Sequence, residues 1–286
     1  MNFNQFDSLL PPQAAERAAE VGVGKATKAP IKSFLLAISA GLHIGIAFIF
    51  YTTVTTGAGD LPWGITRLIG GLAFSLGLIL VVVTGGELFT SSVLTLVARA
   101  SGKISWQALI KNWFVVYFGN MVGALLLVAC MLVTKQYMFD HGQVGLNAMA
   151  ISQHKLHHGF FAAVALGIMC NELVCIAVWM TFSGRTLTDK IAVMILPVAM
   201  FVSAGFEHCI ANMFQVPMAI GIKYFAPEAF WQMTGADIAN YADLNMMGFI
   251  VNNLIPVTIG NIIGGGVFVG MWYWMIYLRD EDKHLR

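Results

Sequence analysis

The residues best suited to chemistry are an adjacent glutamate and histidine, Glu207 and His208, inside a long apolar stretch. Between Lys190 and Lys223 they are the only charged or imidazole side chains. Ionisable groups at membrane depth are costly and usually functional, and imidazole titrates closest to physiological pH. The pair indicates a site that handles charge or a proton. The alternative is a neutral core histidine satisfied by Glu207 and a backbone carbonyl.

A second apolar stretch, between Arg67 and Arg99, is interrupted only by Glu87. Thr90 follows, in the run Leu88-Phe89-Thr90-Ser91-Ser92. A hydroxyl near a helix N-terminus can join free backbone N–H groups in binding an anion. Simple capping of that helix is the alternative. The role of Glu87 stays open.

Other candidates are polar or apolar side chains near these two stretches. Several asparagines and one glutamate lie inside the apolar stretches, and hydrogen bonding between helices is the default explanation for them. Lining a pore is the alternative for Asn171 and Asn261. Lys155 is suited to attracting anions at a pore mouth. A metal site is not favoured at His154, His157 and His158, because no acidic or cysteine ligand accompanies them. Bulky apolar residues near the two stretches could close a passage by dewetting: Phe74, Leu78, Leu88, Phe89, Val174 and Phe201. The other two polar candidates inside the apolar stretches are Asn120 and Glu172.

The composition indicates a membrane protein. Of 286 residues, 58% are hydrophobic and 11% are charged, whereas soluble domains carry about 25% charged residues. A net charge of +1 argues against nucleic-acid binding. The sequence contains no nucleotide-binding motif and no nucleophile constellation, so we expect neither an enzyme nor a cofactor. The four cysteines lie in apolar stretches and suggest no disulfide framework.

Charge-free intervals predict an all-α protein with six membrane spans. The second and fifth intervals are too long for one helix of about 20 residues and too short for two. We therefore expect each to be broken, at 84–87 and 203–208, with both breaks facing a cavity. The span in the last interval is expected to start near Pro256. The predicted spans are 33–56, 68–86, 112–134, 159–184, 191–206 and 244–278.

A repeat supports this arrangement, because Phe118-Gly119-Asn120-Met121-Val122-Gly123 reappears as Ile259-Gly260-Asn261-Ile262-Ile263-Gly264. Three spans occurring twice must form an inverted repeat, which brings the two breaks together near the midplane. Twelve Lys and Arg residues fall on one side of the spans and four on the other. The positive-inside rule then places both termini in the cytoplasm.

The sequence divides into a cytoplasmic N-terminal segment (1–30), a channel domain (31–278, with halves 31–135 and 159–278) and a tail (279–286). Residues 5–28 predict an amphipathic helix that lies beneath the pore and gates it, or an interfacial anchor. The carboxylates of Asp7, Glu16 and Glu20 would then loosen its contacts on acidification. Its apolar face would consist of Phe6, Leu9, Leu10, Ala14, Ala18 and Val21, with Glu16, Arg17, Glu20, Lys25 and Lys28 facing water.

These motifs resemble the formate-nitrite transporter family, and within it the bacterial formate channels. The resemblance covers essentially the whole chain. It rests on Lys25-Ala26-Thr27-Lys28, Leu88-Phe89-Thr90-Ser91, Gly205-Phe206-Glu207-His208 with Ile210-Ala211-Asn212-Met213, and Thr258-Ile259-Gly260-Asn261-Ile262-Ile263-Gly264-Gly265.

The resemblance implies an aquaporin-like fold in the bacterial inner membrane, assembled as a homopentamer with one pore in each protomer. His208 and Thr90 would meet at the pore centre, with Glu207 orienting His208 and with Asn171 and Asn261 supporting the passage. Lys155 would serve the periplasmic entrance and Lys25 the cytoplasmic one. The constrictions would be formed by Phe74, Leu78, Leu88, Phe89 and Phe201.

The expected solute is formate or a related small monovalent anion. A dry constriction opposes an ion, so His208 would donate a proton to formate or pair with it as a cation. A channel and a proton-coupled carrier both remain open, as does a preference for nitrite. An aquaporin-type facilitator of neutral solutes is the other alternative, but Asn212 is followed by Met213 and no arginine occurs in either break.

Overall fold

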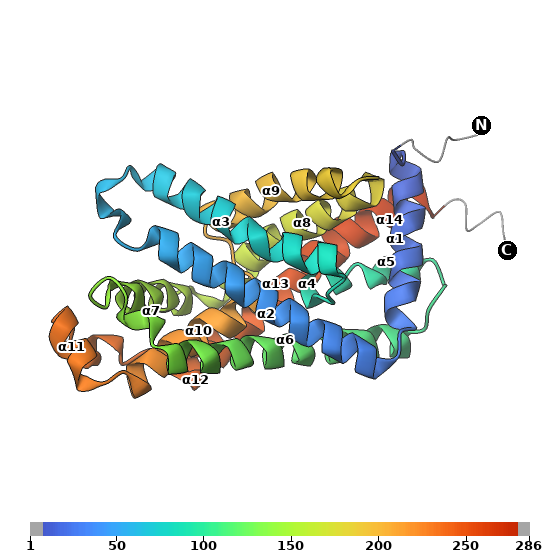
Figure 1. The fold of residues 1–286 in the computed structure, drawn as a ribbon. Coiled ribbons are helices and arrows are strands. Elements are labelled where there is room, and N and C mark those ends of the chain that lie inside the picture. Colours follow the sequence, from blue (N-terminus) through green and yellow to red (C-terminus); the bar gives the residue numbers. More distant parts are fainter. Residues whose placement is uncertain (1–7, 280–286) are drawn as a thin grey trace.

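The computed structural model describes residues 8–279, and within this range the chain is helical and contains no strand. The long helices lie side by side in one bundle, and α1 lies across one end of it (Figure 1). Up to residue 234 the α-helices are α1 (Pro11–Ala26), α2 (Pro30–Thr55), α3 (Trp63–Thr84), α4 (Phe89–Ser92), α5 (Thr95–Ala100), α6 (Trp106–Thr134), α7 (Gln143–Leu156), α8 (Phe160–Ser183), α9 (Leu187–Ser203), α10 (Cys209–Phe225) and α11 (Glu228–Thr234).

Four of these helices, α2, α3, α6 and α8, are long and apolar enough to cross a membrane, and the C-terminal helical stretch up to Tyr277 is a fifth. The predicted fifth span corresponds to the shorter α9, which is 17 residues long. The chain is therefore an integral membrane protein.

The C-terminal stretch differs from the expected start near Pro256. A helical run begins at Met246, where the Asn245 side chain accepts a hydrogen bond from Gly248 N at 2.8 Å. Proline has no N–H to donate and is tolerated where the helical register changes; here a π-helical segment precedes it. The run consists of α12 (Met246–Gly248), a π-helical segment (Phe249–Leu254), α13 (Ile255–Asn261), a second π-helical segment (Ile262–Met271) and α14 (Trp272–Tyr277).

Helix α1 packs on the bundle through small residues. Ala14 and Ala18 are buried, and α1 contacts α5, α8 and α14. Of its predicted apolar face, Leu10 is 53% exposed. Phe6 and Asp7, like the tail after residue 279, lie outside the described residues. Since α1 and α14 are in contact, the two ends of the described chain lie at the same end of the bundle.

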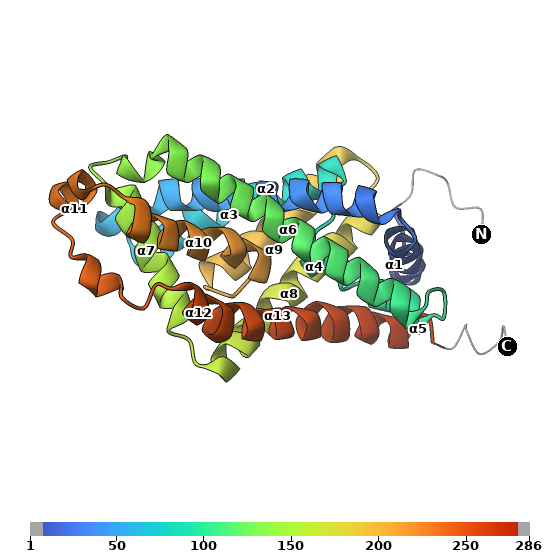
Figure 2. The same ribbon diagram turned by 90° about the horizontal axis from the view of Figure 1, so that it is seen from below.

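Glycines of the repeated motif allow the helices to approach closely. A Cβ atom at Gly123 of α6 would collide with the backbone oxygen of Ile38 in α2. At Gly264, in the corresponding position of the second half, it would collide with the backbone oxygen of Ile168 in α8. Small residues at such crossings are the usual device of membrane bundles. Figure 2 shows α6 crossing α2.

We expect Gly123→Ala and Gly264→Ala each to destabilise the protein by about 1–3 kcal/mol, because the colliding atoms belong to rigid backbone. The thermal midpoint of the detergent-solubilised protein measures the effect. Gly24→Ala is the matched control, since nothing lies within 4 Å of a Cβ atom there. Equal midpoints for all three variants would contradict this account of the helix crossings.

Candidate functional site

Two non-helical segments interrupt the bundle at similar sequence patterns. After α3 the chain turns at Gly85, with φ +77°, and after α9 it turns at Gly205, with φ +78°. Glycine adopts this left-handed conformation without steric cost and commonly ends helices. Helical structure resumes at Phe89 in α4 and at Cys209 in α10. We call residues 85–88 the first break and residues 205–208 the second break.

Each break is held by an asparagine from the repeated motif. Asn120 Oδ1 accepts a hydrogen bond from Phe89 N at 2.9 Å, and its Nδ2 donates to the Glu87 carbonyl at 2.8 Å. Asn261 does the same in the second half, accepting from Cys209 N at 2.9 Å and donating to the Glu207 carbonyl at 2.9 Å.

Asn261 also donates to Gly167 O at 2.8 Å, and its side chain is fully buried. Because these hydrogen bonds engage both of its side-chain polar atoms, the structure places Asn261 as a support of the break and not as a pore-lining group.

The glutamates of the two breaks pair with lysines from the ends of flanking helices. Glu207 accepts from Lys155 Nζ at 3.0 Å, from Asn212 at 2.7 Å and from Asn253 at 3.1 Å. Its carboxylate therefore turns toward Lys155 and the two amides. This differs from the expectation that Glu207 holds the His208 ring.

In the first break, Glu87 accepts from Lys25 Nζ at 2.7 Å and also pairs with Lys28. Sequence analysis left the role of Glu87 open. Glu87 is the residue of the first half that corresponds to Glu207 in the second half. Lys25 and Lys28 were expected to face water, but a buried carboxylate holds both. The two breaks also match in a third contact. Asn112 donates to Lys25 O at 3.2 Å in the first half, and Asn253 donates to Lys155 O at 3.1 Å in the second.

His208 and Thr90 meet in the interior. His208 Nε2 lies 3.1 Å from Thr90 Oγ1, and His208 Nδ1 accepts the Ala211 backbone N–H at 3.1 Å. A neutral imidazole has one donor and one acceptor nitrogen, so accepting at Nδ1 assigns the proton to Nε2. The threonine oxygen then accepts from Nε2, and its own proton is free to reach a solute.

The local structure explains why these two side chains are fixed. His208 is the N-cap of α10, and its ring stacks on Phe201 at a centroid distance of 6.1 Å. Thr90 does not cap α4, because the residue at the cap is Leu88. Instead the Thr90 carbonyl accepts from Asn171 Nδ2 at 3.0 Å and from Cys175 Sγ at 3.2 Å. The Asn171 side chain therefore positions Thr90 by holding the backbone carbonyl of Thr90.

Two cavities come close to this pair: His208 lines one, and Ser91, the residue after Thr90, lines the other. The larger, of about 510 Å³, contains Lys155, Glu207 and His208 in its lining. The other, of about 390 Å³, contains Lys25 and Glu87. Both cavities thus carry a lysine, and each cation is partly compensated by a glutamate.

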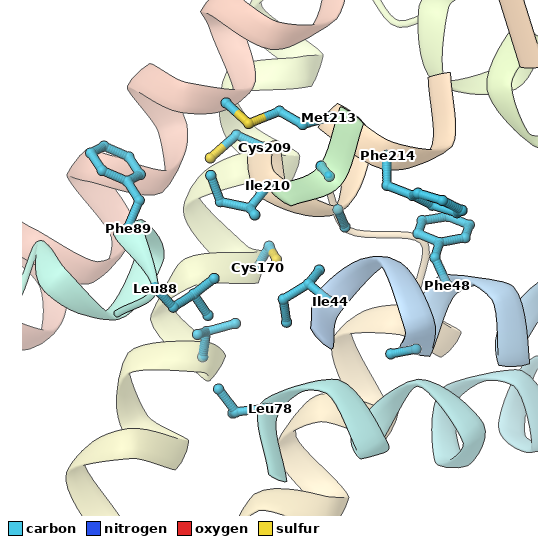
Figure 3. Packing of buried hydrophobic residues seen from close by; sticks show 14 of the residues in the cluster. Ile44, Phe48, Leu78, Leu88, Phe89, Cys170, Cys209, Ile210, Met213 and Phe214 are labelled. Carbon is cyan, nitrogen blue, oxygen red and sulfur yellow. The ribbon is translucent and has the colours of Figure 1, made fainter. Parts of the chain in front are cut away.

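The predicted constriction residues are buried apolar side chains. Leu78 and Leu88 are buried and line neither of them, and Figure 3 shows them in one cluster with Ile44. Phe74 and Phe201 line the larger cavity and contact each other edge to face. The constriction formed by these four residues stays a prediction.

Phe89 lies elsewhere. Its ring packs against Tyr117 and Trp113 of α6, at centroid distances of 4.8 Å and 6.2 Å. In Figure 3 the Phe89 and Leu88 side chains project in opposite directions. Adjacent residues at a helix start project in different directions, so the two could not both face the path. Val174 is buried in the core.

Arg67 is a site residue that sequence reasoning missed. Its guanidinium donates to Ser203 O at 2.8 Å and to Val202 O at 3.0 Å, the last carbonyls of α9, and to Tyr51 Oη at 3.1 Å. It also lines the larger cavity. Neither break contains an arginine in sequence, but α3 brings one to the second break. A lone arginine at the start of an apolar span was the available signal.

The histidines before α8 contact different partners. Across residues 8–279 no three His, Cys, Asp or Glu side chains are grouped to hold a metal ion. His157 pairs with Asp243 at 2.5 Å, while His158 lies 3.7 Å from Glu207. Burial lowers the pKa of His158, nearby Glu207 opposes this effect, and His154 and Lys155 reinforce it.

Comparison with known proteins assigns this arrangement to a family. The model of the formate/nitrite transporter family matches residues 12–275. The chain belongs to the formate/nitrite transporter family. Sequence analysis had identified this family from motifs of the two breaks, and that prediction is confirmed.

Relatives within the formate/nitrite transporter family are similar over nearly their full lengths. The chain is 58% identical to formate channel FocA of Escherichia coli K12, covering 98% of this chain and 99% of the relative. It is 52% identical to FocA of Haemophilus influenzae, covering 93% of each. A solved structure described as a pentameric formate channel with formate bound is 77% identical, with a TM-score of 0.84, covering 87% of this chain and 98% of that one.

Proposed function

We propose that this protein is a formate channel of the bacterial inner membrane, assembled as a homopentamer with a pore in each protomer. The observation that carries the proposal is the buried His208–Thr90 contact, because His208 lines one lysine-bearing cavity and Ser91, next to Thr90, lines another. The relatives named formate channels and the pentameric neighbour support the solute and the assembly.

Formate would enter either cavity by attraction to Lys155 or Lys25 and lose water at the apolar residues. Desolvating a carboxylate is costly unless donors replace the water. The Thr90 hydroxyl and the His208 imidazole would supply these donors at the centre. Charging the imidazole requires a proton at Nδ1, where Ala211 N–H now donates. Protonation of His208 would therefore break the cap of α10, which links the proton relay to a local rearrangement.

The proposed architecture is the aquaporin-like inverted repeat, with a channel domain over residues 31–278. Its halves (31–135 and 159–278) would each contribute three spans, of which the second and fifth are broken. The matching contacts of Asn120 and Asn261 support the repeat. The excess of Lys and Arg on one side supports cytoplasmic termini.

The proposal is tested by measuring solute flux into liposomes that contain the purified protein. We expect saturable formate flux, lower flux of nitrite and hydrosulfide, and water flux no higher than in empty liposomes. Nitrite flux above formate flux would assign the protein to nitrite transport. Water flux without anion flux would instead favour an aquaporin-type facilitator.

Thr90→Val should reduce formate flux by about tenfold with little change in stability. Valine keeps the shape of threonine and removes the hydroxyl, and one lost donor to a charged group in a dry site costs about 1.5–3 kcal/mol. Flux is measured in liposomes, and the thermal midpoint is measured in detergent. Thr90→Ser is the matched control, because it retains the hydroxyl. If stability fell in proportion to flux, Thr90 would have only a structural role.

We further propose that the N-terminal segment (1–30) gates the smaller cavity. Ala18, Gly22 and Lys25 of α1 line this cavity. The carboxylate that ties the end of α1 to the channel is Glu87. Glu16 and Glu20 are exposed, and Glu20 pairs with Arg17 on α1 itself. The acid-sensitive contact would therefore be the one with Glu87, in place of the expected Glu16 and Glu20.

Deleting residues 1–24 should flatten the pH profile of formate flux, because the cavity then stays uncovered at every pH. The same pH series is measured on the full chain. Arg17→Gln is a control that removes an exposed ion pair and should leave the profile unchanged. An unchanged profile in normally assembled oligomers of the deletion variant would leave α1 as an interfacial anchor.

A further inference from the structure

Two polar side chains at mid-membrane have no partner within their own protomer. Glu172 on α8 makes no hydrogen bond or ion pair with any residue in 8–279, and the same holds for the imidazole of His43 on α2, whose Nδ1 is buried. Neither residue lines the cavities on the formate path. A lone carboxyl at this depth is costly, so both groups need a partner from outside the chain.

Each of the two residues lies near the middle of its own helix. His43 is 13 residues after Pro30 and 12 before Thr55, the ends of α2. Glu172 is 12 residues after Phe160 and 11 before Ser183, the ends of α8. At 1.5 Å per residue, both side chains lie near the middle of their spans.

They also lie on opposite flanks of the bundle. Helix α2 packs on α3 and α6, and α8 packs on α9 and α13. The bundle closes where α3 packs on α9 and where Tyr117 of α6 bonds Thr258 of α13 at 3.0 Å. This order places α2 and α8 across from each other, as Figure 1 shows with α2 in front and α8 behind.

Each residue borders an outward apolar surface. On α2, Ile46 and Phe50 are exposed, and on α8, Phe161 and Met169 are exposed. Both His43 and Glu172 are partly exposed beside these surfaces. In a closed ring of identical subunits the contacts are head to tail, so each protomer uses two different surfaces, one toward each neighbour. The flank formed by α2 would then cover the flank formed by α8.

We propose that Glu172 of one protomer pairs with His43 of the neighbouring protomer, so that the ring places one such polar contact at mid-membrane in each interface. The proposal rests on the pentamer of the proposed function and adds which flanks meet and through which residues. The carboxylate accepts from the Nε2–H of His43, because Nδ1 is buried within its own protomer, and apolar side chains around the contact exclude lipid. A second copy of the chain is thus the occupant of both flanks.

Chemical crosslinking tests the contact directly. Cys130→Ser removes the exposed native cysteine, since the other three are buried. In that background, His43→Cys with Glu172→Cys, treated in membranes with a short bifunctional thiosulfonate, should give a ladder up to pentamer on denaturing gels. Each single cysteine variant should stay monomeric. The control pair is Leu126→Cys with Glu172→Cys, because Leu126 is exposed on α6, which belongs to neither flank helix.

Assembly is measured separately by native mass spectrometry. A pentamer without a ladder for the His43 and Glu172 pair, or with a stronger ladder for the control pair, would overturn this inference and leave the proposed pentamer intact. Absence of a pentamer in the unmodified protein would instead overturn the proposed assembly.

A double-substitution cycle provides an independent readout. Glu172→Leu and His43→Phe each leave one polar group unpaired in the interface, so each should lower the temperature at which the pentamer dissociates. The double variant replaces the pair with apolar groups and should recover most of the loss, because a buried pair can often be exchanged for packed hydrophobes. Additive losses would show that the two residues do not touch, and would overturn the inference.

Discussion

His208→Asn is expected to lower formate flux by about tenfold and to flatten its pH dependence. Asparagine is a good N-cap, so its side chain can still accept from Ala211 N, and α10 should begin at the same residue. It cannot take up a proton, and it replaces the Nε2 donor that faces Thr90. Losing one donor to a charged solute costs about 1.5–3 kcal/mol, or a factor of about 10 to 150, and the expected tenfold loss is the lower end of this range.

The measurement is formate flux in liposomes across a pH series, with the thermal midpoint of each variant as a check on folding. His208→Phe is a useful comparison, because phenylalanine can stack on Phe201 but loses both the cap and the donor. It should therefore lower stability as well as flux. A normal pH profile in His208→Asn would refute the proton-linked role and leave His208 as a core residue.

Glu207→Gln is expected to lower the thermal midpoint by about 10 °C. The carboxylate is 1% exposed and the Lys155 side chain is 12% exposed, so the substitution leaves a buried ammonium without its counter-charge. Removing one partner of a buried pair costs about 3–5 kcal/mol, and each kcal/mol corresponds to about 2–4 °C in a chain of this size. Lys155→Met combined with Glu207→Gln should recover part of the loss.

Glu87→Gln is the matched control, because it makes the same chemical change at the corresponding position of the first break. Lys25 and Lys28 are more exposed than Lys155, at 19% and 30%, and can reach water when the carboxylate is neutralised. We expect a smaller drop in the midpoint. Equal drops at Glu87 and Glu207 would show that burial of the lysine does not decide the cost.

Some features of the site were predictable because they depend on local patterns. The glycines at the turns and the ionisable residues in long apolar stretches mark the two breaks without knowledge of the fold. The pairing of His208 with Thr90 was expected from the resemblance to the family, and the two side chains lie in contact. Other partners were not predictable. Arg67 is 136 residues from Ser203, to which it donates, and Glu87 is 62 residues from Lys25.

The sequence by itself determined that the chain is helical, embedded in a membrane and a member of the formate/nitrite transporter family. Apolar runs of span length and contiguous motifs carry this information, because every backbone polar group in lipid must be satisfied within a helix. Only the tertiary structure decided which charges compensate each other and which way Phe89 and Leu88 point. These outcomes depend on helix crossings at Gly123 and Gly264, where backbones touch and bring distant residues together.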